Sequence, residues 1–286
     1  MDIILGATGH VGSEVAKNLI SQGQDITVVT HDPLKKEAWA SRGARVAIVD
    51  VHETEKLASL FKRGDRLFFL NPPADPSTDT VKEEKMTVYS ILEALKGSGI
   101  EKVVAESTYG AQPGDGIGDL GVLQEMEEGL KELGVSTSIL RAAYYMSNWD
   151  GFLRSAREES QIYSLYPIDF KLPMVAPADI GKVAAELLQM PITTNETYYV
   201  EGPEYYSSGD VAKAFSETLG KEVTVKVLTE EEWEPWLMKM GFSQAAAESI
   251  IKMTKITLES NFELPKAPIK GSTTLKAYIN GLVVGN

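Results

Sequence analysis

The stretch LGATGHVG at residues 5–12 follows the short apolar run Ile3–Leu5 and precedes a helical pattern of apolar residues. Its glycines have the spacing GxxGxxG. Gly6 allows a sharp turn out of a strand, Gly9 leaves room where the backbone approaches a pyrophosphate, and Gly12 lets the next helix pack closely on the sheet. In this context the motif predicts a strand, loop and helix that bind a dinucleotide, with phosphates at the helix N-terminus. The candidate contacts of this loop are Gly6, Thr8, Gly9, His10, Val11 and Gly12.

The first half of the chain repeats this unit. Apolar, β-rich runs alternate with helical patterns over residues 1–140, which predicts parallel strands joined by crossover helices. The expected strands are Ile3–Leu5, Ile26–Thr30, Arg45–Val49, Arg66–Leu70, Lys102–Ala105 and Ser136–Leu140, and the clearest helices are His10–Ser21 and Asp79–Gly97. Six strands and five crossovers form a doubly wound, Rossmann-type α/β sheet. Such sheets bind ligands beyond the carboxyl ends of their strands.

The regular alternation stops near Met146. Later strand candidates at Tyr198–Val200 and Glu222–Val227 are separated by helical patterns at Asp179–Gln189 and Gly209–Leu219, and Thr229–Glu259 is almost wholly helical in pattern. We predict a dinucleotide-binding domain over residues 1–145 and a smaller α+β cap over 146–286, some of whose elements return to the main domain. The apolar side chains midway along the last segment either pack between cap and sheet or line a substrate pocket. They are Trp233, Trp236, Met238, Met240 and Phe242.

The composition excludes several classes of protein. Twenty-eight Lys and Arg against 41 Asp and Glu give the 286 residues a net charge of −13, which disfavours binding to nucleic acid. The absence of cysteine excludes disulfides and thiolate metal sites, and no metal site is expected from the three scattered histidines. No apolar run approaches the roughly 18 residues of a membrane span, and the stretch MDIILG at residues 1–6 lacks a basic region followed by a long apolar segment. We therefore expect a cytoplasmic protein.

The end of the second expected strand decides which dinucleotide binds. A carboxylate there would chelate the ribose hydroxyls of NAD, whereas a basic group would favour the additional phosphate of NADP. The strand end at Thr30 is uncharged, and His31, Lys35 and Lys36 lie nearby, although Asp32 opposes the argument. We predict NADP, with NAD as the alternative, and His31 and Lys36 as contacts. The two lysines are also typical of a solvated helix face.

Several motifs together resemble a known family. They are the glycine motif, Asp50-Val51, SILR at residues 138–141, YYMSN at 144–148 and ADIG at 178–181. With these motifs the chain resembles the NmrA-like, atypical branch of the short-chain dehydrogenase/reductase superfamily. Within that branch it is most similar to the quinone oxidoreductase type 2 and triphenylmethane reductase subgroup, which has a similar length and a similar ending to GSTTLKAY at 271–278. The resemblance covers essentially the whole chain, but none of its motifs is specific for a substrate.

The resemblance implies roles for residues at matching positions. Asp50 and Val51 would hold the adenine, Asn71 and Pro72 would border the ribose, and Ser107 and Ala143 would lie at the nicotinamide. Tyr144 and Tyr145 would also flank the nicotinamide, with Tyr145 and Asn148 at the mouth of the substrate site. Apart from the resemblance, we predict that the acceptor also lies against Tyr109, Trp233 and Phe242. Two departures are Val49, where a Gly ordinarily precedes the Asp, and His31, where many relatives carry Arg.

The usual catalytic pair of the superfamily is missing. Ordinary members carry Tyr-x-x-x-Lys on the helix after the fifth strand, but Asp119–Leu130 contains no Tyr, Lys or His. The position of the Lys falls on Leu123, which we expect to face the cofactor cleft beside the core stripe through Val122 and Met126. The remaining candidate acids are Tyr109 and Tyr145. Glu106 and Glu127 are also candidates for a carboxylate pair, but nothing in the sequence fixes their separation.

Two functions fit these features. The first is an NAD(P)H-dependent oxidoreductase that transfers hydride to a small planar acceptor, such as a quinone or an azo or triphenylmethane dye, which takes any proton from solvent. The second is an idle dinucleotide-binding redox sensor of NmrA type that reports its occupancy to a protein partner. A sugar-nucleotide epimerase is less favoured because its chemistry needs the missing Tyr and Lys. The oligomeric state stays open, with a homodimer among the states allowed.

Overall fold

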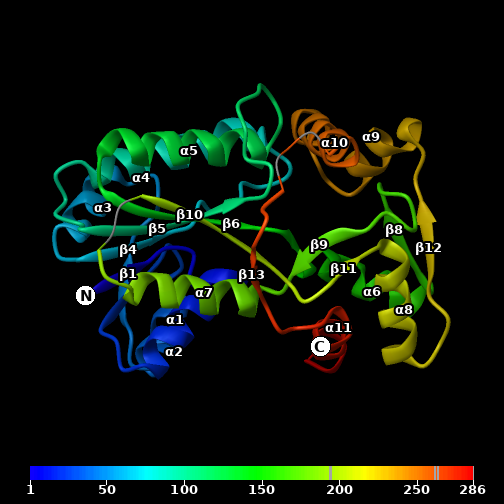
Figure 1. Ribbon diagram of the computed structural model, residues 1–286, viewed down its shortest axis with the longest axis horizontal. Helices are drawn as coiled ribbons and strands as arrows, with labels where there is room; N and C mark the ends of the chain where they lie inside the picture. The colour runs from blue at the N-terminus through cyan, green and yellow to red at the C-terminus, as the bar shows by residue number, and fades with distance from the viewer. Residues whose placement is uncertain (193–194, 261, 263, 286) are drawn as a thin grey trace.

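An eight-stranded parallel sheet forms the centre of the protein, for which a computed structural model describes residues 1–192, 195–260, 262 and 264–285 (Figure 1). The strand order is β13-β10-β6-β5-β4-β1-β2-β3. The chain starts at β1, runs outward through β2 and β3, and then fills the other side from β4, which confirms the predicted doubly wound Rossmann-type fold. The strands are β1 Asp2–Ile4, β2 Ile26–Thr30, β3 Arg45–Ile48, β4 Arg66–Phe69, β5 Lys102–Thr108, β6 Ser136–Ala142, β10 Glu196–Glu201 and β13 Ile269–Lys270.

Helices cover both faces of the sheet (Figure 1). One face carries α1 His10–Ser21, α2 Lys36–Ala40 and α7 Pro177–Gln189, and the other carries α3 Thr54–Phe61, α4 Thr80–Leu95 and α5 Asp119–Leu133. Successive strand side chains point to opposite faces, so Ile4 and Val104 join the first core whereas Ile3 and Val103 join the second. The alternating apolar burial of these strands therefore builds two hydrophobic layers.

The second half of the chain builds a smaller α+β region. It contains a three-stranded sheet of β7 Tyr144–Tyr145, β9 Leu172–Val175 and β11 Tyr205–Tyr206, and a parallel pair of β8 Gln161–Ser164 and β12 Thr224–Val227. Its α-helices are α6 Leu153–Glu158, α8 Ser208–Leu219, α9 Glu230–Lys239, α10 Gln244–Leu258 and α11 Leu275–Gly285, and its 3-10 helix is η2 Met146–Phe152. A second 3-10 helix, η1 Pro33–Lys35, lies in the first half of the chain. Three elements of this half, α7, β10 and β13, lie in the main layers, and β10 and β13 extend the sheet beyond the six strands expected.

The expected helix over Thr229–Glu259 is interrupted. It consists of α9 and α10, separated by residues 240–243, where Gly241 has a φ of +96° that favours glycine. The hydroxyl of Ser243 then accepts a hydrogen bond from the N–H of Ala246 and starts α10. The helical period of the apolar residues continues across the break, so the pattern alone did not reveal it.

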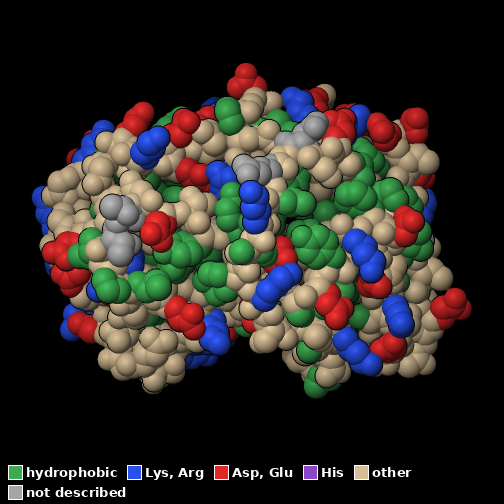
Figure 2. All heavy atoms as spheres, viewed as in Figure 1, with side chains coloured by type: hydrophobic (Ala, Val, Ile, Leu, Met, Phe, Trp, Pro, Cys, Tyr) green, Lys and Arg blue, Asp and Glu red, His purple; other side chains and the backbone are tan. Residues whose placement is uncertain are grey.

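Surface charge is mixed on the face in view. Lys and Arg side chains lie scattered among Asp and Glu side chains rather than in a basic stripe (Figure 2). Within the described ranges, no helix combines the length and the apolar character needed to cross a lipid bilayer.

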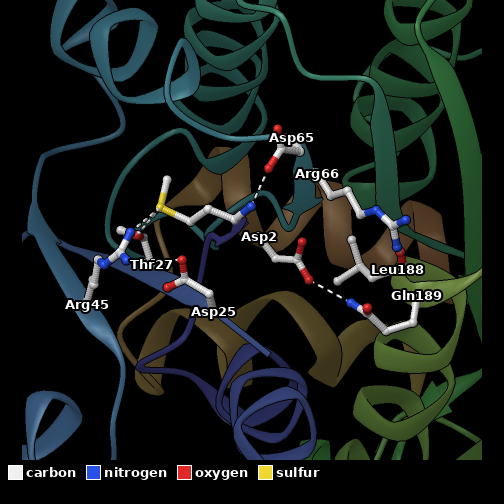
Figure 3. A network of polar contacts seen from close by, with 9 residues as sticks. Asp2, Asp25, Thr27, Arg45, Asp65, Arg66, Leu188 and Gln189 are labelled. Carbon is white, nitrogen blue, oxygen red and sulfur yellow. Dashed lines mark hydrogen bonds and ion pairs between the residues drawn. The ribbon is translucent and has the colours of Figure 1, made fainter. Parts of the chain in front are cut away.

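The C-terminal end of α7 is fixed to the amino edge of the sheet. The ammonium group of Lys102 on β5, only 1 % exposed, donates to the carbonyl oxygens of Leu187 at 2.5 Å and Met190 at 3.0 Å. Beside it, Arg66 donates to the carbonyl of Leu188, and Gln189 donates to Asp2 at 2.6 Å (Figure 3). Positive groups at this position also complement the helix dipole. These contacts tie a helix of the second half to strands of the first.

Replacing Lys102 tests this connection. Lys102→Met removes the donor from buried carbonyl groups, so we expect the free energy of unfolding to fall by about 1–3 kcal/mol. Urea denaturation followed by circular dichroism measures the loss. Lys62→Met, at an exposed lysine, is the matched control, and equal losses in the two variants would contradict the assigned role.

Candidate cofactor and acceptor site

The glycine loop has the geometry of a phosphate cradle. Gly6 adopts a φ of +65°, and a Cβ added to Gly12 would lie 2.3 Å from the carbonyl oxygen of Gly6. Gly9 differs, because its added Cβ would meet its nearest neighbour at 3.4 Å. In the described part of the chain, no side chain caps the start of α1 at Gly9. The loop therefore presents backbone N–H groups toward a ligand with no side chain between them.

A cavity of about 370 Å³ opens beside this loop. It runs along the carboxyl ends of β1, β2, β3 and β4, where the fold class places a dinucleotide. Of the predicted cofactor contacts, six line it: Gly6, Thr8, His31, Asp50, Val51 and Pro72. The first four strands and the loop thus supply one continuous site whose shape and donor groups fit the adenosine and phosphate portion of a dinucleotide.

Asp32 is engaged by its own backbone. Its carboxylate accepts the N–H of Leu34 at 2.9 Å and caps η1, while His31 lines the cavity. Lys36 is exposed at the start of α2, outside the lining residues. The carboxylate that opposed NADP in the sequence therefore has a local structural role.

Other predicted cofactor residues lie around this cavity rather than in its lining. Val11 is buried at the start of α1, and His10 faces a second cavity of about 630 Å³ shared with Asp150 and Tyr278. Ala143 is buried and donates its N–H to Val200 at 3.0 Å. Asn71 donates its amide to the backbone carbonyl of Glu84 at 3.2 Å.

The two carboxylates proposed as a pair have different partners. Glu127 accepts the hydroxyl of Ser107 at 2.5 Å and forms two hydrogen bonds with Arg141, at 2.9 and 2.8 Å. Glu106, next to Ser107 on β5, accepts instead from the phenol of Tyr145. Because Glu106 and Ser107 are consecutive in a strand, their side chains point to opposite faces, which separates the two carboxylates.

The two candidate proton donors also bind different acids. The buried phenol of Tyr109 donates to Glu201 at 3.2 Å, and its ring meets Tyr199 edge-on at 5.3 Å between centroids. Burial, together with the charge of Glu201, raises the pKa of Tyr109. Tyr145 is half-buried and bonded to Glu106, and burial raises its pKa well above the usual value. Both tyrosines therefore hold their protons at neutral pH.

The remaining predicted acceptor residues lie in the cap. Tyr144 packs between Trp149 and Tyr166, with centroids 6.2 and 6.1 Å away, and Asn148 is exposed. Trp233 is buried, and its indole N–H donates to the carbonyl of Leu228 at 3.1 Å, so this side chain belongs to the packing of the cap. Phe242 follows α9 and is half-buried. None of these four lines either cavity described above.

Leu123 does not form an open wall of the cleft as expected. It is half-buried and packs against the second core, next to the fully buried Val122 and Met126. The stripe on α5 was predicted correctly, but the second core extends to the neighbouring position as well. The polar groups at the carboxyl end of β5 come instead from Glu84, Glu106 and Asp119.

Two acids that the sequence analysis did not select, Glu84 and Asp119, lie at this end of the sheet together with Glu106. Glu106 is 4 % exposed, and burial raises its pKa to about 7. Glu84 on α4 accepts the N–H of Ala74 at 3.1 Å, and burial with the nearby charge of Asp119 raises its pKa to about 8. Burial also raises the pKa of Asp119 at the start of α5. These carboxyl groups hold protons at a pH where exposed acids are ionised.

Two sequence signals could have found them. Asp119 lies four residues before Leu123, where the missing pair would have its Tyr. Glu84 lies four residues before Val88 on the buried face of α4, so an acid occupies an apolar stripe. Within the described residues, no cluster of three or more His, Asp or Glu side chains is arranged to hold a metal ion.

Residues 3–278 of the chain match the model of the NmrA-like family. The glycine loop, the strand order and the other motifs agree with this match. The chain belongs to the NmrA-like family. It is 25% identical over 251 residues to an NAD(P)H azoreductase of Xenophilus azovorans, covering 87% of this chain and 85% of the relative. Quinone oxidoreductase 2 of Escherichia coli (strain K12) is 22% identical, with 87% and 85% covered. The structure of Citrobacter sp. triphenylmethane reductase complexed with NADP(H) is similar at a TM-score of 0.79, with 21% identity and 99% of each chain covered.

The glycine loop yields a prediction for binding. Gly9→Asp places a carboxylate where a pyrophosphate would lie, yet the backbone there has an ordinary φ of −95° and space for a Cβ. We expect loss of NADPH binding, measured by the fluorescence of the reduced nicotinamide, with an unchanged circular dichroism spectrum. Gly285→Asp, at an open position on α11, is the control. Unchanged NADPH affinity in Gly9→Asp would remove the basis of the assigned cofactor site.

The buried acids yield a prediction for stability. Because the folded pKa of Glu84 lies above the unfolded value, its contribution to stability is complete below about pH 4.5 and is lost as pH rises through about 8. We expect Glu84→Gln to raise the free energy of unfolding relative to wild type at pH 8, by on the order of 1–3 kcal/mol, and less at pH 5. Urea titrations at both pH values measure the difference. The exposed acid Glu93, changed to Gln, should give no pH-dependent gain.

Proposed function

We propose that the protein is an NADPH-dependent reductase that transfers hydride to a small planar acceptor, such as a quinone or an azo or triphenylmethane dye. The observation that carries the proposal is the cavity at the carboxyl ends of β1 to β4, joined to a glycine loop that has no room for a side chain at Gly12. The relatives named as an azoreductase and a quinone oxidoreductase support the class of acceptor.

The chain's own residues would bind and orient the cofactor, whose reduced nicotinamide supplies the hydride. The N-terminus of α1 would hold the phosphates, His31 would face the additional phosphate of NADP, and Asp50 with Val51 would border the adenine. Asn71, Ser107 and Ala143 would lie along the other half. Precise placement accounts for much of the rate in such a reaction, because the acceptor is strongly electrophilic.

The acceptor would lie at the carboxyl ends of β5 and β6, between the main sheet and the cap. Tyr145 follows β6 directly and Tyr109 follows β5, and each holds its proton at neutral pH. In this proposal Tyr145 contacts the acceptor together with Asn148, which lies in the first turn of η2. Tyr109 shapes the floor of the site through its hydrogen bond to Glu201. A cytoplasmic location and a homodimeric state stay predictions that this chemistry does not require.

A dinucleotide-dependent sensor is the second candidate, because α5 carries no Tyr, Lys or His over Asp119–Leu130. Such a protein would bind NADPH without oxidising it and would report its occupancy to a protein partner. The two candidates therefore differ in turnover rather than in binding.

Anaerobic mixing of the protein with NADPH and a small benzoquinone separates them. For the reductase we expect binding to change the fluorescence of the reduced nicotinamide, followed by a protein-dependent loss of that signal well above the uncatalysed rate. The Gly9→Asp protein, which should not bind the cofactor, gives the background. Tight binding with no oxidation would reject the reductase in favour of the sensor.

A further inference from the structure

The hydrogen-bonded pair of Tyr145 and Glu106 has features that cofactor binding alone does not require. The phenol of Tyr145 donates to one carboxyl oxygen of Glu106, at the carboxyl end of β5. The second oxygen, Oε2, is buried and has no hydrogen-bond partner among the residues that the structure describes. An ionised carboxylate in this position would lack the hydrogen bonds that buried charges need. The geometry therefore favours a neutral Glu106.

Two other tyrosine–carboxylate pairs include a cation, whereas for the pairs of Tyr198 with Glu196 and of Tyr278 with Asp150 no ion pair is found among the described residues. Glu201, which accepts from Tyr109, also forms an ion pair with Lys270. Glu125 accepts from Tyr89 at 2.8 Å and from Lys85 at 2.6 Å. Each of these two carboxylates therefore has an ammonium group within ion-pair distance. The pair of Tyr145 and Glu106 has a different electrostatic environment.

The charged groups around this pair are mostly acids. The negative charge of Asp119 at the start of α5 helps to raise the pKa of Tyr145, and it also raises the pKa of Glu84 on α4. Arg141 on β6 lies nearby in sequence but is bonded to Glu127 on α5. Burial raises the pKa of Glu106 to about 7, against a small opposing effect of the hydrogen bond from Tyr145. The surroundings thus keep a proton on Glu106 up to neutral pH.

We propose that Glu106 stores a proton behind Tyr145, so that Tyr145 donates its own proton to the acceptor and is recharged by Glu106. The proposal rests on the proposed reductase function and assigns Glu106 as a positioning residue that acts through Tyr145. It also explains how α5 can lack the usual Tyr and Lys, because the proton comes from β5 and β7 instead.

The proton balance is complete for an azo acceptor. Two electrons and one hydrogen nucleus pass as hydride to one azo nitrogen and leave the dinucleotide oxidised. The other nitrogen takes the proton of Tyr145, whose O–H bond breaks as the N–H bond forms. For the recharge the hydrogen bond of the pair reverses, so that the acid proton lies on the Glu106 oxygen that faces the phenol. That O–H bond breaks as the phenolate oxygen takes the proton, and the resulting carboxylate takes one from solvent. The products are a hydrazo compound and the original protonated pair.

The acceptor class decides whether the relay matters. A triphenylmethane dye cation becomes neutral when it takes a hydride, so it needs no proton. An azo dye needs one proton for each hydride. The relay therefore predicts that the rate of azo reduction depends on Glu106 and that the rate of triphenylmethane reduction does not. A purely structural side chain would affect both rates.

The experiment compares these two acceptors with NADPH in wild type and Glu106→Gln. The Gln side chain keeps a carbonyl oxygen for Tyr145 but has no acidic proton. We expect azo reduction to fall roughly 10- to 100-fold, with reduction of the triphenylmethane cation unchanged. Wild-type azo reduction should decline above pH about 7, as Glu106 ionises, and Glu106→Gln should lack that decline. Tyr145→Phe, which removes the donor itself and alters an acceptor contact, should lower azo reduction by a larger factor than reduction of the triphenylmethane cation.

A direct readout of the proton does not depend on turnover. Infrared difference spectroscopy of wild type between pH 5 and pH 9 should show a protonated buried carboxyl that titrates near pH 7 and is missing in Glu106→Gln. Glu125→Gln is the matched control, because it alters an exposed carboxylate paired with a tyrosine. It should change neither the split between acceptors nor this band.

The outcomes are distinct. If Glu106→Gln lowers the reduction rate equally with both acceptors, or lowers it with neither, the relay is overturned and the reductase function stays intact. A Glu106 carboxylate that is ionised throughout the pH range would overturn it as well. Wild-type protein that binds NADPH but reduces neither acceptor would overturn the proposed function, and the relay with it.

Discussion

The close approach of α1 to the glycine loop is the constraint on which the rest of the site depends. A Cβ on Gly12 would lie 2.3 Å from the carbonyl oxygen of Gly6, so the helix can start this near the sheet only with glycine there. That approach points the helix N-terminus and its N–H groups at the carboxyl ends of the strands. The cavity lined by Gly6, Thr8 and Asp50 exists because the loop is narrow and the neighbouring strands end at the same edge.

Burial of acids gives the other end of the site its chemistry. Glu84, Glu106 and Asp119 come from α4, β5 and α5, and each has a raised pKa mainly because solvent is excluded. Such groups oppose folding at high pH, so their presence at the carboxyl edge weakens stability where the ligand site lies. A cost of this kind is expected at sites that move protons. The ion pair of Glu127 with Arg141 on the opposite face of β5 serves packing instead.

The chain returns to the main sheet after it has built the cap. Lys102 and Arg66 hold the end of α7, and β10 pairs with β6 across the full length of the strand. These contacts fix the second half of the chain to the main sheet, near β7 with Tyr145. This arrangement makes β7, which directly follows β6, the point where the main sheet and the cap sheet meet. The proposed acceptor site lies at this junction because both layers supply side chains to it.

The sequence by itself determined the Rossmann-type fold and the glycine loop, since these depend on local periodicity and on glycine spacing. Of the six predicted residues that line the cavity, Gly6 and Thr8 belong to that loop and His31 follows the second strand, whereas Asp50, Val51 and Pro72 were implied by the family resemblance. Tertiary structure decided the rest. Leu123 packs against the second core, Trp233 packs inside the cap, and α9 ends just before Gly241 turns the chain. An apolar pattern does not distinguish these outcomes from the alternatives. Glu106 and Tyr145 are 39 residues apart, and their hydrogen bond forms only because β5 and β6 are neighbours in the sheet. The proton-holding character of Glu106 comes from burial, which the identity of a residue does not fix.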